Sequence, residues 1–537
     1  MSQPNQNSNP NSNFSSSSFP SSTKLPFSPP STILIIGSGV FGLSTAYALA
    51  QRPDFVNSSI TVVDRSAEPA VFPSRDASSI DTSRIIRADY ADPAYAHLAA
   101  EALVQWRKQG DDDLGGQGRY SETGLVLVAD EPPTADAVDG GTGQAGDLPP
   151  VDAQPGKKTG MYYVRASWEN VKAIAQSGDA EVATSIRELP SSEAIRDAVG
   201  TGGSSGSWGY LNASSGWADA EASMAWLYQR VVSTGRVHFI NGTVTSLVHA
   251  GETVTGAVLS TSQTISADLV VLATGAWTGS LIDLSGQATA TGQVLAYMDL
   301  TDEEQAQLAK MPTLLNLSSG LFIITPSHNV LKVARHAYGY LNPTTTVTSP
   351  LRPSQGDSTG HTNNTVSLPV THVDQPDLSI PPAAEELLRS AVHAMVPLPS
   401  LKGRPFTKTR LCWYTDTPSG DFIVDYHPHW RGLFLATGGS GHGFKFLPVI
   451  GEKIVDCIKG ECPSEFKTKW SWKTSGTFTG WDAVITEDGS RGGKPGLILQ
   501  EEMGRLRRKT LCHKTEEEAQ GLIKTGKLRG FPDDKST

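Results

Sequence analysis

The sequence predicts an α/β protein built on a parallel sheet, and the order of its first segments is the main reason. An apolar, β-branched run at Thr32–Ile36 predicts a buried strand, Phe41–Ala50 contains helix formers without proline, and Ile60–Asp64 predicts a second strand. This strand–helix–strand order places both strands in one parallel sheet that helices cover. Leu269–Ala273 and Leu433–Thr437 are further apolar runs, each followed by a glycine turn, and we expect both to be core strands.

The size and charge of the chain limit the classes of protein to which it can belong. Its 537 residues are enough for two domains, or for one large domain with a second inserted in it. With 38% hydrophobic and 18% charged residues, the composition is that of a soluble globular protein. The formal net charge of −11 argues against a nucleic-acid partner, whose phosphates require a basic surface.

The cysteine content and the absence of long apolar runs indicate an intracellular protein. Four cysteines are too few for a disulfide framework, and none lies in a Cys-x-x-Cys pair, so we expect no metal site. No apolar run approaches the length of about 18 residues that a membrane-spanning helix needs. The N-terminal region lacks the apolar core of a signal peptide, and Lys535-Ser536-Thr537 is not a peroxisomal signal. We expect a cytoplasmic monomer without membrane contact.

Changes in composition along the chain predict several segments outside the folded core. Residues 1–30 are rich in Ser, Asn and Pro and are predicted to be disordered. The stretches 129–160 and 343–366 are dense in turn-forming and polar residues, which predicts exposed insertions. Residues 461–537 are polar and irregular, and we expect them to form a loosely packed C-terminal tail.

The turn after the first strand has the pattern G-x-G-x-x-G, formed by Gly37, Gly39 and Gly42. Gly37 permits the tight turn, Gly39 lets the backbone approach a pyrophosphate, and Gly42 lets the helix pack closely on the strand. The helix N-terminus offers free N–H groups and the positive end of its dipole to the phosphates. The alternative is a glycine turn that binds no nucleotide, but the flanking strand and helix favour a dinucleotide site.

Asp64, at the end of the second strand, strengthens this interpretation. Its carboxylate is placed to accept hydrogen bonds from both ribose hydroxyls, and it would repel the 2′-phosphate of NADP. The fingerprint alone does not distinguish NAD from FAD. The strand Leu269–Ala273 runs into Gly275 and Trp277 and is suited to close over the adenosine half of an extended dinucleotide.

Four blocks of the sequence resemble the sarcosine-oxidase group of flavoprotein amine oxidases. That group includes saccharopine and pipecolate oxidases and the fructosyl amino acid oxidases, or amadoriases. The resemblance extends over roughly residues 31–460. The first block is the glycine fingerprint with Asp64-Arg65, the second is 83–90 and the third is 331–336. The fourth block consists of the segments 412–418, 425–428 and 439–446. The segments after residue 412 are the most specific.

The resemblance implies that the cofactor is FAD, bound covalently through a thioether between Cys412 and the 8α-methyl carbon of the flavin. A thiolate is a strong nucleophile, so the chemistry is reasonable, while the alternative is a small buried thiol. The positions that match the family's cofactor site are Gly37, Gly39, Val40, Phe41, Gly42, Asp64, Arg65, Ser83, Arg84, Val244, Gly275, Trp277, Cys412, Gly441, Gly443, Phe444 and Lys445.

Three further positions are implied to be catalytic. Lys332 is expected over the flavin ring, where a fixed ammonium stabilises the superoxide that forms when O2 takes one electron. His336, four residues further along a predicted strand, is implied to line the active site, and its alternative is a core histidine. Tyr414 is implied to border the substrate cavity, and its alternative is a buried structural tyrosine.

Basic residues in two of the blocks are implied to bind an acidic substrate. Arg87 and Lys445 match the positions that hold the substrate carboxylate, and Arg84 matches a catalytic position near the flavin. A guanidinium can bind a carboxylate through two parallel hydrogen bonds, and an ammonium adds a point charge. The alternative for Arg87 is a surface ion pair with Asp89 or Asp92.

The family implies a Rossmann-like FAD-binding domain of the type in glucose oxidase and D-amino-acid oxidase, with a discontinuous α+β second domain. We assign residues 31–95, 205–290 and 405–460 to the FAD-binding domain. Residues 96–204 and 291–404 are assigned to the substrate domain, for which we expect a mixed or antiparallel sheet.

The implied reaction is oxidation of the C–N bond of a secondary or N-alkyl amino acid to an imine, with O2 as acceptor and H2O2 as product. The segments 412–418 and 425–428 resemble saccharopine and sarcosine oxidases more than amadoriases. The aliphatic run 321–326 and the two insertions depart from the family pattern and argue against simple sarcosine specificity. The alternatives are a tailoring oxidase of a fungal natural-product pathway, an amadoriase, a dehydrogenase, and a flavin-binding protein without catalysis.

Overall fold

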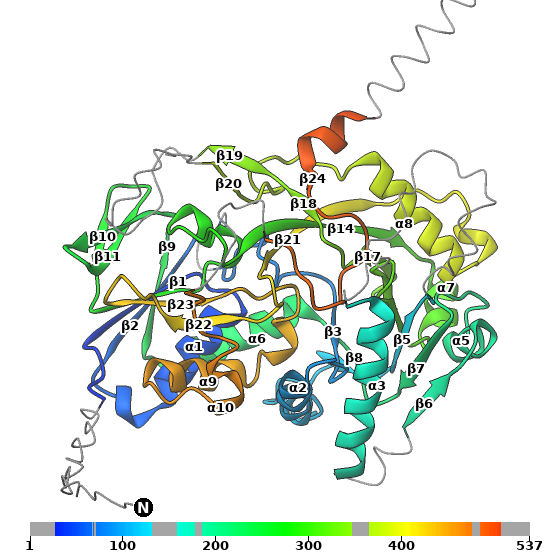
Figure 1. The fold of residues 1–537 in the computed structure, drawn as a ribbon, viewed down its shortest axis with the longest axis horizontal. Helices are drawn as coiled ribbons and strands as arrows, with labels where there is room; N and C mark the ends of the chain where they lie inside the picture. The colour runs from blue at the N-terminus through cyan, green and yellow to red at the C-terminus, as the bar shows by residue number, and fades with distance from the viewer. Residues whose placement is uncertain are drawn as a thin grey trace, which may run out of the picture.

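A computed structural model describes residues 27–66, 68, 71–131, 158–177, 185–345, 365–474 and 484–505. This part of the chain contains two large sheets, and Figure 1 shows the parallel one on the left and the other in the centre and on the right. The predicted disordered N-terminus and both predicted insertions fall almost entirely outside the described residues. None of the helices in the described ranges is long and apolar enough to cross a membrane.

The first sheet has six strands and contains the four strands predicted for the parallel sheet. Its spatial order is β22-β23-β13-β1-β2-β9, and all neighbours are parallel except the edge pair β22 and β23. The strands are β22 (Ile423–Tyr426), β23 (Leu433–Thr437), β13 (Leu269–Leu272), β1 (Thr32–Ile36), β2 (Ser59–Asp64) and β9 (Val237–Asn241). The predicted parallel sheet is therefore confirmed.

The two faces of this sheet have different covers, because successive side chains of a strand point to opposite faces. Ile33 and Ile35 pack among residues of α1 (Val40–Gln51), α6 (Ala220–Ser233) and α9 (Ile450–Ile458). Leu34 and Ile36 pack instead against a three-stranded antiparallel sheet, β10 (Val244–Ala250), β11 (Thr253–Leu259) and β12 (Thr264–Ser266). The expectation that helices cover the sheet is thus correct for one face and wrong for the other.

The second sheet has ten strands and is mixed, as predicted. Its order is β24-β18-β14-β17-β16-β15-β5-β7-β6, and β21 pairs with β14 beside this path. The strands are β24 (Leu497–Ile498), β18 (Tyr340–Leu341), β14 (Thr289–Asp299), β17 (Val330–Arg335), β16 (Leu321–Ser327), β15 (Thr313–Asn316), β5 (Leu125–Ala129), β7 (Trp208–Asn212), β6 (Ile186–Leu189) and β21 (Lys408–Asp416). The mixed α/β fold class is confirmed, while the domain limits stay predictions.

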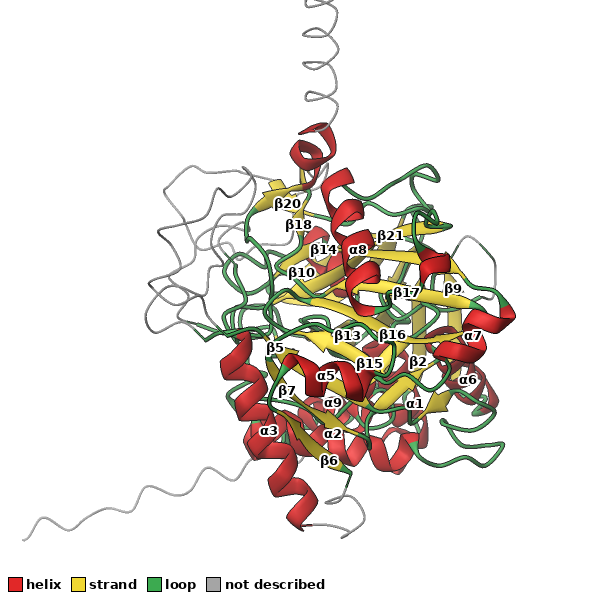
Figure 2. Ribbon diagram, turned by 90° about the vertical axis from the view of Figure 1, so that its right-hand side faces the viewer, coloured by secondary structure: helices red, strands yellow, loops and turns green. Residues whose placement is uncertain are grey.

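Helix α8 (Pro382–Met395) covers the outer face of the second sheet, as Figure 2 shows. The other described elements are smaller or peripheral. The remaining helices are α2 (Pro93–Trp106), α3 (Gly160–Ser177), α5 (Ser192–Val199), α7 (Asp302–Leu308) and α10 (Ser464–Lys467). Two further small sheets lie in the described residues. One contains β3 (Arg84–Ile86), β8 (Gly216–Ala218) and β4 (Tyr120–Ser121), and the other contains β19 (Pro343–Thr345) and β20 (Thr365–Ser367).

The expectation of a loosely packed tail after residue 460 is wrong for its described parts. Phe466 and Trp470 are fully buried and stack on each other with ring centroids 4.1 Å apart. The segment 484–505 adds β24 to the second sheet and buries Leu499 in the core beneath α8. The region is polar in overall composition, but its few apolar residues, such as Phe466, Trp470 and Leu499, are buried and attach it to the core.

Candidate active site

A cavity with a volume of about 340 Å³ lies where the two sheets meet. One wall is the carboxyl-terminal edge of the parallel sheet, where β1, β2, β13 and β23 end. The other wall is the inner face of the second sheet, formed by alternate residues of β14, β16, β17 and β21. Every residue predicted for the site lines this cavity except Gly42 and Ser83.

The glycine turn at the end of β1 has no room for side chains. Gly37 has a φ of +101°, and a Cβ atom on it would lie 2.4 Å from the carbonyl oxygen of Ala273. A Cβ atom on Gly42 would lie 1.9 Å from the oxygen of Gly37, so Gly42 serves the packing of α1 against the turn. Both glycines are therefore required by close backbone contacts.

The region around Gly39 offers free hydrogen-bond donors. Gly39 caps α1 without a side-chain hydrogen bond, which leaves the first amide groups of the helix available. The hydroxyl of Ser79, 3.9 Å from the position of a Cβ atom on Gly39, is buried and has no hydrogen-bond partner among the described residues. Free helix amides and an unpaired hydroxyl beside a glycine turn suit the pyrophosphate of a dinucleotide such as FAD.

The carboxylate of Asp64 is already engaged with the turn that it follows. One oxygen accepts hydrogen bonds from the backbone nitrogen and hydroxyl of Ser38 at 2.8 and 2.6 Å, and the other accepts from the amide of Arg65 at 2.8 Å. Burial raises the pKa of Asp64, although these bonds oppose the rise. The guanidinium of Arg65 lies 4.9 Å from the ring of Trp277 at the same end of the cavity, which Val244 and Gly275 also line.

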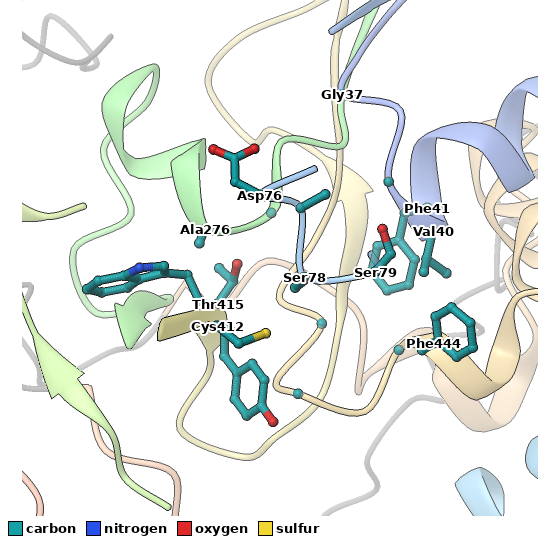
Figure 3. A pocket seen from close by; sticks show the side chains of 18 of the residues that line it. Gly37, Val40, Phe41, Asp76, Ser78, Ser79, Ala276, Cys412, Thr415 and Phe444 are labelled. Atoms are coloured by element: carbon teal, nitrogen blue, oxygen red, sulfur yellow. The ribbon is translucent and has the colours of Figure 1, made fainter. Parts of the chain in front are cut away.

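The inner face of the second sheet carries Cys412 and Lys332 because the side-chain direction alternates along its strands. In β21, Leu411 and Trp413 join the core beneath α8, while Cys412 faces the cavity. Figure 3 shows the sulfur of Cys412 projecting into the cavity across from the Ser78–Ser79 segment. A guanidinium nitrogen of Arg84 lies 3.5 Å from this sulfur.

Lys332 is fully buried and is held by Asp81, which the sequence analysis did not single out. Its ammonium donates to a carboxylate oxygen of Asp81 at 2.7 Å and to the carbonyl of Ser83 at 2.6 Å. Arg84 also forms an ion pair with Asp81, and the hydroxyl of Tyr297 donates to its other oxygen at 2.7 Å. Ser83 thus contributes its backbone carbonyl to the network, not a cavity-lining side chain.

Opposite charges in this network control the protonation of its members. Burial would raise the pKa of Asp81, but the adjacent charges of Arg84 and Lys332 hold it well below the usual range. Burial lowers the pKa of Lys332 from 10.5 to about 8, against the opposing attraction of Asp81. Lys332 is therefore mainly a cation at neutral pH and loses its proton in mildly alkaline solution.

Arg87 is buried in the cavity wall, and the expected alternative of a surface ion pair does not describe it. Its Nη1 atom has no hydrogen-bond partner among the described residues, and the guanidinium lies 4.8 Å from the ring centroid of Tyr90. Asp89 instead accepts hydrogen bonds from Asn212 and Ser215, while Asp92 caps α2 and pairs with Lys469. A buried guanidinium with an unpaired donor is suited to an anionic ligand.

Lys445 lies beside Arg87 in the same wall. Its ammonium donates to the hydroxyl of Tyr90 at 2.9 Å and to the carbonyl of His442 at 3.1 Å. Burial, together with the charge of Arg87, lowers the pKa of Lys445 well below its ordinary value. An anionic ligand between Arg87 and Lys445 would raise the pKa of Lys445 again, because an opposite charge favours the ammonium form.

His336 and Tyr414 face the cavity from β17 and β21, with their ring centroids 5.8 Å apart. Burial and the charge of the nearby Arg491 keep the pKa of His336 well below its ordinary value, so the imidazole is neutral. Burial raises the pKa of Tyr414, which keeps its hydroxyl protonated. Both residues line the site as predicted from the resemblance, as do Phe444, Gly441 and Gly443.

Sequence reasoning missed Ser79, Asp81, Tyr297, Arg410 and Arg491. Asp81 and Arg410 belong to one network, because Arg410 donates to the carbonyl oxygens of Ile80 and Ala77 and so fixes the loop that carries Asp81. The nearness of Asp81 to the Ser83–Arg87 block was its only signal in the sequence. Arg491 lies in a glycine-rich stretch that gave no signal at all.

Comparisons with known proteins agree with this geometry. An amino acid oxidase named imqH from Aspergillus flavus is 33% identical over 479 residues, which cover 80% of this chain and 93% of that protein. An L-saccharopine oxidase from Schizosaccharomyces pombe is 28% identical over 82% of this chain and 93% of its own. The crystal structure of fructosamine oxidase (Amadoriase II) from Aspergillus fumigatus is similar, with a TM-score of 0.66, 25% identity, and coverage of 87% of this chain and 95% of that one.

The model of one protein family matches the greater part of the chain. It is the family described as FAD dependent oxidoreductase, and the match extends over residues 32–457, from the first strand of the parallel sheet to the last turn of α9. The matched range includes the glycine turn, the Asp81 network and the Cys412 and Lys445 segments. The chain therefore belongs to the FAD-dependent oxidoreductase family and is an enzyme of that class.

Proposed function

We propose that this enzyme oxidises the C–N bond of a secondary or N-alkyl amino acid to an imine, with O2 as the electron acceptor and H2O2 as the product. The observation that carries the proposal is the buried guanidinium of Arg87, whose Nη1 atom has no hydrogen-bond partner among the described residues, beside Lys445 in the same cavity as Lys332 and Cys412. An anionic substrate group and an oxidisable bond can thus be held in one enclosed space. The names of the oxidases that resemble this chain support the same class of substrate.

FAD, when bound, accepts a hydride equivalent from the carbon next to the substrate nitrogen and returns two electrons to O2. The protein's own contribution at the phosphates comes from the free amides of α1 and the hydroxyl of Ser79. At the other end of the cavity we assign Cys412 as the covalent attachment point. Its sulfur projects into the cavity, and a guanidinium nitrogen of Arg84 lies 3.5 Å from it.

Arg87 and Lys445 bind and orient the substrate through its carboxylate. Each charge-assisted hydrogen bond contributes about 1.5–3 kcal/mol, more than a neutral one, and Arg87 has a free donor for it. Fixing the carboxylate leaves the amine-bearing carbon little freedom, which lowers the entropic barrier to reaction. We assign Tyr414 and His336 to the remaining wall of the cavity, where both are uncharged and exclude water from the amine.

Lys332 serves the reaction with O2. Its ammonium is fixed by Asp81 and Ser83, so it is already oriented when negative charge develops on oxygen. Arg84 adds a second cation to the same network. The substrate amine must be neutral to lose hydride equivalents, so the rate of substrate oxidation should rise with pH as the bound amine loses its proton.

A panel of amines tests the proposed function. The purified enzyme is mixed in air with N-methyl amino acids, saccharopine, pipecolate and fructosyl amino acids, and H2O2 release is measured. We expect peroxide with at least one amine that carries a carboxylate and, at the same concentration, much less with the matching amine that lacks it. Bleaching of the flavin by substrate without peroxide in air would instead identify a dehydrogenase. No bleaching with any amine would identify a protein that binds flavin without this catalysis.

The same panel separates the more specific substrates. Release of peroxide from fructosyl amino acids alone would identify an amadoriase, which the structural similarity to fructosamine oxidase favours. Release from N-methyl or cyclic amino acids would instead support a tailoring or catabolic oxidase, in line with the more similar curated relatives.

A further inference from the structure

The segment 484–505 lies outside the residues that match the family model, yet it reaches the wall of the active site. It is anchored first near the end of β21, where the hydroxyl of Thr486 donates to the carbonyl of Thr417 at 2.9 Å and the amide of Glu487 donates to the carbonyl of Pro418 at 2.9 Å. Further along, the amide of Tyr338 donates to Gly492, and β24 pairs with β18. The backbone of this segment is therefore fixed on both sides of Arg491.

Glycines on both sides of Arg491 allow this close approach. Gly489 and Gly493 have φ values of +85° and +81°, which favour glycine. A Cβ atom on Gly492 would lie 2.2 Å from the backbone of Ser319, so no other residue fits there without a shift. The local sequence Gly-Ser-Arg-Gly-Gly is thus shaped to insert one long side chain between two packed backbone segments.

The side chain of Arg491 is 1% exposed and joins three parts of the site. Its Nη2 atom donates to the carboxylate of Asp416 at 2.5 Å and to the carbonyl of Ser440 at 2.8 Å. Its Nη1 atom lies 2.9 Å from both ring nitrogens of His336. The guanidinium carbon lies 5.4 Å from the ring centroid of Tyr414. Both rings line the cavity, while Arg491 stands behind them.

We propose that the C-terminal segment completes the substrate cavity and that Arg491 is the positioning residue through which it acts, by holding His336 and Tyr414 in place. A guanidinium can only donate hydrogen bonds, so it selects the neutral imidazole and fixes the ring plane. It also ties β17, β21 and the Ser440 turn together directly behind the substrate. This inference rests on the proposed function, because it assumes that these two rings contact the substrate.

The test compares Arg491→Gln and Arg491→Lys with Arg505→Gln in the full-length enzyme with its flavin bound. Arg505 is a matched control because it lies in the same segment but is exposed and forms an ion pair with Glu502, three residues earlier. For an amine that the wild type oxidises, we expect Arg491→Gln to raise KM at least tenfold per bound flavin, and Arg491→Lys to raise it less. Arg505→Gln should stay within twofold. Lower protein stability alone would reduce the amount of active enzyme but not change KM.

Benzoate provides a readout that does not depend on turnover. Its Kd, measured from the visible spectrum of the bound flavin, should rise at least fivefold in Arg491→Gln and stay unchanged in Arg505→Gln. Unchanged KM and Kd in folded Arg491→Gln enzyme would overturn the inference. If Arg491→Gln does not fold, a KM within twofold of wild type in Arg491→Lys overturns it, because an ammonium cannot reach Asp416, Ser440 and His336 together.

The two proposals fail in different ways in this experiment. If benzoate binding depends on Arg491 but no amine releases peroxide, the oxidase function is wrong and the role of the C-terminal segment stands. If neither an amine nor benzoate binds to the wild type, both proposals are wrong.

Discussion

The two ends of the cavity are built in different ways. At the dinucleotide end, the surface is mostly backbone, namely the glycine turn after β1 and the first amides of α1, which are adjacent in the sequence. At the catalytic end, the surface is made of side chains such as Lys332 and Cys412 on strands of the second sheet, and Asp81 holds Lys332 from a loop that lies 251 residues earlier in the chain. The first end requires the absence of side chains, and the second depends on particular ones.

This difference predicts that substitutions at the catalytic end change the chemistry, while substitutions at the glycine turn change binding and folding.

Replacing Cys412 with Ala should abolish covalent attachment of the flavin. The thioether needs the sulfur that projects into the cavity, and no other cysteine among the described residues lines it. The measurement is acid precipitation of the purified protein, which should leave a yellow pellet for the wild type and a yellow supernatant for Cys412→Ala. Cys457→Ala, at a buried cysteine outside the cavity, is the control. Free flavin from the wild type would rule out the attachment.

Replacing Lys332 with Met should slow the reaction of the reduced enzyme with O2 by about 10²–10³-fold, the usual effect of removing one oriented charge-stabilising donor. Reduction by substrate without air should change much less, because we assign Lys332 to the O2 step. Stopped-flow absorbance follows each half-reaction separately. Lys459→Met, which removes a lysine paired with Asp54 at the surface, should leave both rates unchanged. Equal slowing of both half-reactions would contradict the assignment.

Gly37→Ala should lower the free energy of unfolding by about 2–4 kcal/mol and weaken flavin binding, since it combines a left-handed φ with a severe backbone contact. Gly235 is the matched control, because its φ is also positive, at +64°, but no atom lies within 4 Å of an added Cβ. Gly235→Ala should cost only about 1–2 kcal/mol. Chemical denaturation measures the free energy of unfolding of both variants. Equal costs at the two positions would show that the contact with Ala273 is unimportant.

Arg87→Ala should raise KM for substrates with a carboxylate by about 10–100-fold, the equivalent of one charge-assisted hydrogen bond. The same variant should have little effect on an amine that lacks the carboxylate. Arg107→Ala is a suitable control, because Arg107 is partly exposed and pairs with Glu122. If KM for both amines rises equally, Arg87 supports the fold of the cavity and does not bind the carboxylate.

The rate of the O2 half-reaction should fall by about tenfold between pH 7 and pH 9. Lys332 has a lowered pKa of about 8, so its side chain is protonated in most enzyme molecules at pH 7 and in few at pH 9. The rate of substrate reduction should move in the opposite direction over this range. Mixing reduced enzyme with oxygenated buffers of different pH isolates the first effect. A flat profile in wild type, or an equal decline in Lys332→Met, would contradict this prediction.

The same comparison explains how far the sequence could be interpreted. The β1–α1–β2 unit was predictable because its signals are local, namely strand composition, glycine spacing and Asp64 at a strand end. The cover on the second face of this sheet was not, because β10–β12 lie nearly two hundred residues away. The sequence of an apolar run such as Leu34–Ile36 does not indicate whether a helix or a sheet packs against it.

At the catalytic end, most of the residues could be named from the sequence, but their contacts with one another could not be predicted. Lys332 and Cys412 came from the resemblance, yet their common wall depends on the register of β17 and β21 on either side of β14. Asp81 was overlooked because a carboxylate near arginines is ordinary in sequence and exceptional only when fully buried. Arg491 could not be found, since the contacts of a glycine-flanked arginine are set entirely by tertiary structure.

The unpaired Nη1 atom of Arg87 also has a consequence for the stability of the enzyme at rest. A buried donor without a hydrogen bond costs free energy in the native state. A carboxylate that binds there removes this penalty and also shifts the folding equilibrium by mass action. The melting temperature should therefore rise with carboxylate concentration even when the compound cannot be oxidised. Thermal shift with simple acids would then reveal substrate preference before any turnover is measured.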